Sequence, residues 1–157
     1  MGLIPSSDNM PSSKFIFPLN LGTVKANQNF TIQMAINNLE TGKFTNPDKN
    51  YFAAPQQLNS QGIIVGHSHV VIQEISSFNE TTTLDPKKFA FFSALNSAAV
   101  NGVLKVTVGG GLPVGTYKLS SINTAANHQP ALVPIAQHGS LDDAIYVSRS
   151  VIFDNID

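Results

Sequence analysis

Two of the four histidines in this chain lie close together inside an apolar run. The motif is Gly66-His67-Ser68-His69, with Ile63-Ile64-Val65 before it and Val70-Val71-Ile72 after it. In an extended chain, successive side chains point to opposite faces, so His67 and His69 share one face. Two neighbouring imidazoles on an apolar surface can hold a metal ion, bind a polar ligand, or simply form hydrogen bonds with their surroundings.

The other two histidines stand in loop-like sequence that could fold back over this strand. The candidate ligand-binding residues are therefore His67, His69, Asn127, His128, Gln129 and His138. Three neutral imidazoles, two from one strand and one from a loop, can bind Zn or Cu and leave a coordination position open, which makes His67, His69 and His128 the candidate metal ligands. The alternative, which we favour at this level, needs no cofactor: each imidazole bonds to a backbone carbonyl or a nearby polar side chain.

Other catalytic arrangements are weaker. Ser68 and Ser140 stand next to histidines, but the chain has no Gly-x-Ser-x-Gly motif to expose a serine nucleophile. Asp142-Asp143 would point to opposite faces of a strand, and a turn that leads into a strand explains the pair better. Gly109-Gly110-Gly111 is followed by Leu-Pro rather than by a helix, which favours a hairpin turn over a phosphate-binding loop. A protein that is not an enzyme is therefore favoured.

Composition narrows the class of protein. The 157 residues, 42% of them hydrophobic, are enough for one domain with its own core. Charged residues make up 12% of the chain and the formal net charge is -1, which disfavours nucleic acid and membrane surfaces as partners. The start of the chain lacks the basic-then-apolar layout of a signal peptide. We expect a flexible, Ser- and Pro-rich arm over residues 1–14 and a single domain over 15–157.

Several segments alternate between apolar and polar residues with a period of two, which predicts strands. They are residues 29–37, the histidine strand 62–75, the segments 103–108 and 116–120 joined by a glycine-rich hairpin turn, and a last strand pair over 144–153. One short helix is expected from Asp85-Pro86 to Leu95, because Phe89, Phe92 and Leu95 have helical spacing. The pattern predicts an all-β fold, an antiparallel β-sandwich of immunoglobulin-like or jelly-roll type with one short helix.

Two polar segments are candidates for the contact surface of this domain. They are Asn46–Gln61 and Asn123–His138. The second is rich in Asn, Gln, Ala and Pro, and we expect an ordered loop whose amides bond to backbone groups at a strand edge.

Several long sequence segments resemble those of a group of small, mostly secreted fungal proteins of uncharacterised function. These segments are Gly66–Val71, Gly111–Tyr117, Ser121–Pro130 and Gln137–Asp143, within a similarity that covers roughly Phe15 to Val147. The resemblance implies an extracellular or cell-wall location, with cell-wall carbohydrate or another surface protein as the partner, and it implies no activity. Some of these proteins carry a ribosomal label, which nine basic against ten acidic residues do not support.

Overall fold

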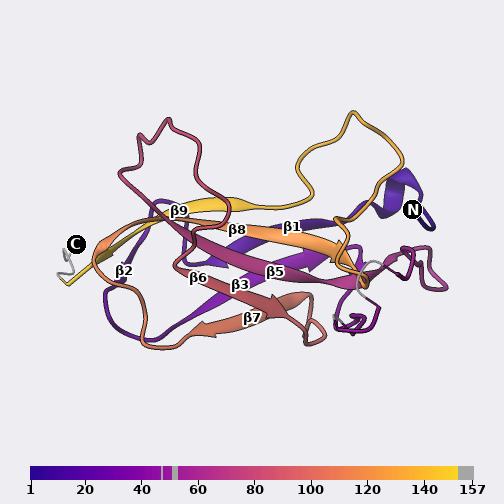
Figure 1. Cartoon of the computed structure of the whole chain (residues 1–157), viewed down its shortest axis with the longest axis horizontal. Helices are drawn as coiled ribbons and strands as arrows, with labels where there is room; N and C mark the ends of the chain where they lie inside the picture. The colour runs from indigo at the N-terminus through magenta and orange to yellow at the C-terminus, as the bar shows by residue number, and fades with distance from the viewer. Residues whose placement is uncertain (47, 51–52, 152–157) are drawn as a thin grey trace.

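The protein folds into two β-sheets with a shared apolar core between them (Figure 1). The computed structural model describes residues 1–46, 48–50 and 53–151. One sheet has three strands in the order β1-β3-β7, and the other has six, in the order β2-β9-β8-β5-β4 with β6 also beside β5. The strands are β1 (Ser12–Phe17), β2 (Thr23–Lys25), β3 (Phe30–Asn37), β4 (Leu39–Glu40), β5 (Ile64–Ile75), β6 (Phe91–Leu95), β7 (Val103–Val108), β8 (Gly115–Ala125) and β9 (Ala144–Ser150).

This arrangement confirms the predicted all-β sandwich architecture. Within the described ranges, the one helical element is the 3-10 turn η1 (Ser7–Asn9), and no helix there is long and apolar enough to cross a membrane. Two strand pairs are parallel, β2 with β9 and β4 with β5, so the larger sheet is mixed rather than purely antiparallel.

The core follows the period-two alternation of the strands. In β3, Phe30, Ile32 and Met34 point inward, as the sequence pattern predicts, and meet Val70 and Ile72 of β5 in the same cluster. Burying an aliphatic side chain of this kind stabilises the fold by about 1.5 to 3 kcal/mol. Because alternate side chains of a strand are buried in this core, the residues between them must lie on the opposite face of the sheet.

Strands β5 and β8 form a long antiparallel ladder from the pair Gly66–Ala125 to the pair Ile75–Thr116. The register is continuous, so the alternation of β5 is not shifted by a bulge at Gly66. A Cβ at Gly66 would overlap the carbonyl oxygen of Thr124, so only glycine lets the two backbones approach here. In β5, Val70 and Ile72 belong to the core shared with the three-stranded sheet, and His67 and His69 lie on the opposite, outer face.

The helix predicted over Asp85–Leu95 is wrong. Asp85 begins a turn, in which its carboxylate accepts a bond from the backbone N–H of Lys87 at 3.0 Å, and Phe91–Leu95 continues as strand β6 beside β5. In β6, Phe91 and Leu95 pack against the core while Phe92 is exposed. Core packing on alternate residues therefore overrides the helical spacing of the aromatic residues.

The glycine-rich hairpin predicted between residues 108 and 116 is also wrong. Strand β7 pairs with β3 and strand β8 pairs with β5, so the connection passes from one sheet to the other. Leu112, 5% exposed, enters the core, and its carbonyl accepts the N–H of Asn27 at 2.8 Å. Gly111 has φ 67° and lies so close to the backbone of Gln28 that no side chain would fit. The glycines serve a crossover between sheets, not a tight turn.

The two ends of the domain differ in detail from the prediction. Strand β1 begins at Ser12, so the arm boundary expected at residue 14 falls within a strand. Before it, Gly2 forms a bridge with Gln56, and the side-chain amide of Asn9 donates to the carbonyl of Gln61 at 3.0 Å. The last strand pair is the single strand β9 to residue 150, while residues 152 and 153 of the predicted segment lie outside the described residues.

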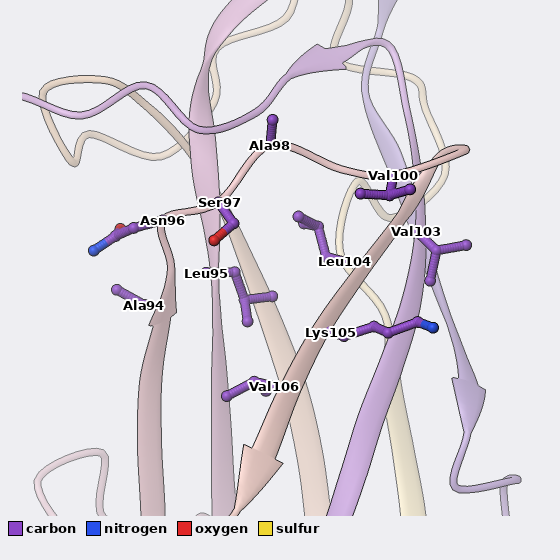
Figure 2. A pocket seen from close by; sticks show the side chains of 10 residues that line it. All are labelled: Ala94, Leu95, Asn96, Ser97, Ala98, Val100, Val103, Leu104, Lys105 and Val106. Carbon is purple, nitrogen blue, oxygen red and sulfur yellow. The ribbon is translucent and has the colours of Figure 1, made fainter.

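A pocket of about 350 Å³ opens on the side of the sandwich where β6 and β7 run next to each other (Figure 2). The side chains of Leu95, Leu104 and Val106 point into the space between the two strands. Lys105 is the one ionisable residue of the lining. This pocket therefore offers no group of side chains for acid-base or metal chemistry.

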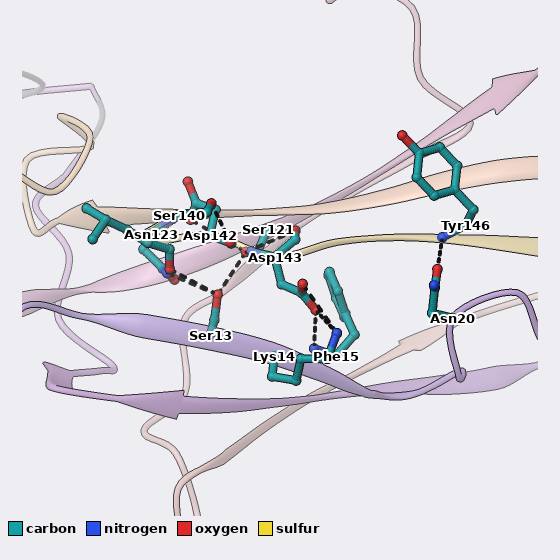
Figure 3. A network of polar contacts seen from close by, with 11 residues as sticks. Ser13, Lys14, Phe15, Asn20, Ser121, Asn123, Ser140, Asp142, Asp143 and Tyr146 are labelled. Atoms are coloured by element: carbon teal, nitrogen blue, oxygen red, sulfur yellow. Dashed lines mark hydrogen bonds and ion pairs between the residues drawn. The ribbon is translucent and has the colours of Figure 1, made fainter. Parts of the chain in front are cut away.

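A polar network joins β1 to β8 and to the start of β9 (Figure 3). The hydroxyls of Ser13 and Ser121 lie 3.0 Å apart, and the amide of Asn123 donates to Ser13 Oγ at 3.2 Å. Asp143 accepts from the backbone N–H of Phe15 at 2.8 Å and forms an ion pair with Lys14 at 3.1 Å. Asp143 thus ties the two sheets together at one edge, while Asp142 accepts the backbone N–H of Asn123 within the larger sheet at 2.7 Å.

Candidate metal centre

His67 and His69 lie on the outer face of β5, as the alternation predicts. Their cross-strand partners on β8 are Thr124 and Ile122, respectively. Although this face points away from the three-stranded sheet, His67 is 0% exposed and His69 is 8% exposed. Both imidazoles are therefore covered by segments that fold over the outer face.

One of these segments is the turn that follows β8 and carries His128. The backbone N–H of His128 donates to the carbonyl of Ala125 at 3.0 Å, and the N–H of Ala125 donates to the carbonyl of Gln129 at 2.9 Å. His128 has φ 67°, in the left-handed region that a residue other than glycine seldom adopts. Backbone strain of this kind, of order 1 to 3 kcal/mol, is concentrated at functional sites. The turn holds His128 over the histidine pair of β5.

The three imidazoles converge. His67 Nε2 lies 3.1 Å from His69 Nε2 and 3.1 Å from His128 Nδ1. One nitrogen from each of the three rings lies within 4.8 Å of the others. The rings of His69 and His128 are parallel, with an interplanar angle of 2°, and the His67 ring stands at 78° to each of them. His67 is therefore the middle member of the group.

The backbone fixes the proton position on His67. Its Nδ1 lies 3.0 Å from the carbonyl oxygen of Lys43, and because a carbonyl can only accept, this nitrogen carries the proton. The Nε2 atom of neutral His67 then bears a lone pair directed at His69 and His128. One lone pair accepts one good hydrogen bond, yet two ring nitrogens lie at 3.1 Å from it. A cation placed among the three nitrogens would satisfy all of them.

Electrostatics favours the neutral form of these imidazoles. Burial, together with the smaller repulsion from His67 and His128, lowers the pKa of His69 from its ordinary 6.5 to about 4. Burial also lowers the pKa of His67, while the hydrogen bond to the Lys43 carbonyl acts in the opposite direction. Neutral imidazole is the form that binds a metal, so protons compete weakly for this site.

Two phenylalanines border the histidines. The Phe44 ring meets the His67 ring edge-on at 6.1 Å, and the Phe92 ring lies 5.3 Å from His69. Both are large exposed apolar side chains, at 50% and 46%. Two partly exposed aromatic side chains thus flank the buried pair His67 and His69.

The comparison with known proteins places this chain in a family. Residues 13–150 match the model of the CLU5d N-terminal domain. The chain belongs to the CLU5d N-terminal domain family. Pathogenicity cluster 5 protein d of Colletotrichum graminicola is 45% identical over 145 residues, which are 91% of this chain and 30% of that relative. The chain therefore spans less than a third of the length of the relative it matches.

Membership in this family supports the resemblance to fungal proteins whose function is unclear. The relative's name refers to pathogenicity and states no substrate, ligand or activity. Secretion, a cell-wall location and a carbohydrate or protein partner stay predictions for this CLU5d domain.

The other predicted ligand-binding residues, Asn127, Gln129 and His138, are not part of the three-histidine group. Asn127, 3% exposed, shapes the turn: its side-chain oxygen accepts the N–H of Gln129 at 3.1 Å. Gln129 Oε1 accepts a bond from the Asn127 amide at 3.2 Å. His138 is exposed and bonds to the carbonyl of Gly139, outside the three-histidine group. The structure thus brings together three of the four histidines.

The two loops proposed as a contact surface are reassigned in part. Asn123 to Ala125 belong to β8, so the second loop begins at residue 126. Residues 47, 51 and 52 of the first loop lie outside the described residues.

The serines named as possible nucleophiles lie elsewhere. Ser68 is on the inner face of β5, opposite to the histidines, and its hydroxyl donates to the carbonyl of Ile122 at 3.3 Å. Ser140 donates to the carbonyl of Asp142 at 2.6 Å.

Sequence reasoning missed the residues that surround the imidazoles. Thr124 Oγ1 lies 3.4 Å from His67 Nε2, and the Lys43 carbonyl fixes the His67 tautomer. A backbone carbonyl leaves no trace in the residue types of a sequence. Thr124, by contrast, could have been found by pairing the histidine strand with the segment 116–125.

Proposed function

We propose that this domain binds a transition metal ion through His67, His69 and His128. The proposal rests on one observation: nitrogens of three imidazoles, from a strand and a turn distant in sequence, converge within 4.8 Å. The fixed His67 tautomer supports it, because a metal-bound histidine typically donates its other N–H to a carbonyl or carboxylate. A merely structural cluster would have no need to direct several nitrogens at one point.

The arrangement fits copper better than zinc. In a tetrahedral zinc site with bonds of about 2.05 Å, each pair of ligand atoms is about 3.4 Å apart. Here His67 lies 3.1 Å from each of the other two, and the group as a whole spreads over up to 4.8 Å. A middle ligand with two flanking ones resembles three corners of a tetragonal Cu²⁺ site, with the remaining corner open. Zinc binding would require His69 and His128 to approach each other by a small ring rotation.

The test is metal uptake by protein purified without a histidine tag. The untagged protein is incubated with Cu²⁺ or Zn²⁺, freed of excess metal, and analysed for bound metal. We expect one Cu²⁺ per chain in the parent and none at this site in His69→Ala. His138→Ala is the matched control, because it removes a histidine outside the cluster, and it should retain the metal. Electron paramagnetic resonance should show nitrogen coupling to the copper in the parent and in His138→Ala.

The alternative is a structural histidine cluster. In that case neither metal would raise the melting temperature of the parent, and His67→Ala or His69→Ala would still destabilise the fold by about 1 to 3 kcal/mol through lost packing and unpaired partners. A metal that binds the native state alone must instead stabilise it by mass action. A parent that takes up no copper, or takes up as much as His69→Ala, would contradict the proposal.

A further inference from the structure

A second concave site lies on the outer face of the larger sheet, next to the histidines. It is a pocket of about 470 Å³, and its floor includes Val71, two residues after His69 on β5. Ile122, the cross-strand partner of His69, also lines it. Its volume falls in the range of small-molecule binding sites, about 300 to 1,000 Å³. The pocket therefore continues the face that carries the histidine cluster.

The loop 76–90 forms one wall of this pocket, and it rises from the end of β5 in Figure 1. The side-chain amide of Gln73 fastens the loop to the sheet, because it donates to the carbonyls of Asp85 at 3.3 Å and Lys88 at 3.2 Å. Glu80 organises the tip: its carboxylate accepts from the hydroxyl of Ser76 and from the backbone N–H of Thr82. The wall is thus hydrogen-bonded in place.

The lining combines an apolar half with hydrogen-bonding groups. Ile122 and the ring of Tyr146 provide apolar surface, and Ser120, Lys118 and Glu80 provide donors and acceptors. Tyr146 is 37% exposed, so its ring is available to a ligand. Within the described part of the chain, Lys118 forms no ion pair, which leaves its ammonium group able to donate.

The charges of the lining disfavour an ionic ligand. One carboxylate and one ammonium group share the pocket, so an anion would meet Glu80 and a cation would meet Lys118. Both oxygens of Glu80 already accept hydrogen bonds from Ser76 and Thr82, which makes Glu80 a poor partner for a ligand ammonium group. A neutral ligand with many hydroxyls and one apolar face matches an aromatic ring beside mixed donors and acceptors.

We propose that this pocket binds a neutral saccharide, with one face of a sugar ring against Tyr146 and its hydroxyls bonded to Lys118 and Ser120. The site is distinct from the metal centre, because none of the three histidines lines it. Saccharide binding therefore does not need the metal. The ligand class follows from the lining alone.

The test is a titration of metal-free protein, in the presence of a chelator, with soluble neutral hexasaccharides of glucose, N-acetylglucosamine or mannose. Chemical shifts of backbone amides in β5, β8 and the loop 76–90 should move with at least one of these probes. Tyr146→Ala and Lys118→Met should each weaken binding about tenfold or more. Phe17→Ala is the matched control, because Phe17 is 40% exposed and lies outside the pocket, and its affinity should equal that of the parent.

Melting curves show whether each variant is folded, and the Lys118 variant tests the proposal even if the tyrosine variant fails to fold. The proposal is overturned if no hexasaccharide binds, or if Tyr146→Ala and Lys118→Met both bind like the parent. A free amino acid that shifts the same amides when the saccharides do not would also overturn it. Saccharide binding that appears only after copper loading would assign the ligand to the histidine centre instead.

Discussion

The two faces of β5 and β8 carry opposite kinds of side chain. On the inner face, Val70, Ile72 and Leu119 are 0% exposed and pack against the three-stranded sheet. On the outer face, the same strands present His67 and His69 and the polar pocket beside them. Neighbouring residues on one strand face opposite ways, so residues that stabilise the core alternate with residues that are available to a ligand. Substitutions at adjacent positions should therefore have different consequences.

The largest expected effect is on the inner face. Ile72→Ala should lower the free energy of unfolding by about 2 to 5 kcal/mol, because it removes buried methyl groups and leaves a cavity. Phe92→Ala, on the outer face and 46% exposed, should cost about 1 kcal/mol or less. Urea denaturation of both variants measures the difference. Equal losses would show that the outer face is as important for stability as the core.

The outer face should give the fold a pH dependence. Burial holds the pKa of His69 at about 4, below its ordinary value of 6.5, so the unfolded chain binds more protons than the native one between these values. Stability should therefore be fully present above pH 6.5 and decrease as the pH falls toward 4, by at most about 3 kcal/mol from this residue. Urea midpoints across this range in metal-free protein should fall less steeply for His69→Gln than for the parent. His138→Gln should keep the slope of the parent, and parallel slopes for all three proteins would rule out this source of the pH dependence.

The inner face becomes polar toward the end of β8, where a buried amide replaces the apolar side chains. Asn123, 2% exposed, donates to the carbonyl of Leu141 at 2.8 Å. Asn123→Ala should destabilise the fold by about 1 to 3 kcal/mol, because it leaves this carbonyl without its donor. Thermal unfolding measures the loss, and metal uptake should not change. A simultaneous loss of metal would show that the network and the histidine centre are coupled.

The smallest effect is expected at the exposed rim of the same network. Lys14 is 62% exposed, and its ion pair with Asp143 is screened by water and salt. Lys14→Met should therefore change the free energy of unfolding by less than about 1 kcal/mol. The difference should shrink further when urea denaturation is repeated at high salt. A loss as large as that of Asn123→Ala would mean that the charge, not the buried amide, holds the sheets together.

The sequence predicted correctly those strands in which the alternation of apolar and polar residues alone determines which side chains are buried. The alternation in β3 and β5 gave the buried face directly, and it placed His67 and His69 side by side. The meeting of His128 with this pair was a hypothesis about a loop, and the turn at Ala125 to Gln129 brings it about. Whether the group binds metal depends on ligand affinity, which residue order alone does not determine.

The failures share a cause in tertiary packing. Phe89, Phe92 and Leu95 have helical spacing, but the segment pairs with β5 as strand β6 instead. In this strand Phe91 packs against the core. The glycines after β7 could form a hairpin in isolation, yet the burial of Leu112 draws the chain across to the other sheet. In both places a long-range contact outweighs a local preference.

The position of His128 has a mechanical consequence. His67 and His128 are 61 residues apart in sequence, so a metal shared between them would close a long loop of chain. Such a closure restricts the unfolded chain as a cross-link does, and the gain grows with loop length. The ion would join β5 to the end of β8 in a chain that has no cysteine with which to form a disulfide. Loss of the metal in an acidic or chelating environment would then remove this cross-link and the stability that the ion adds.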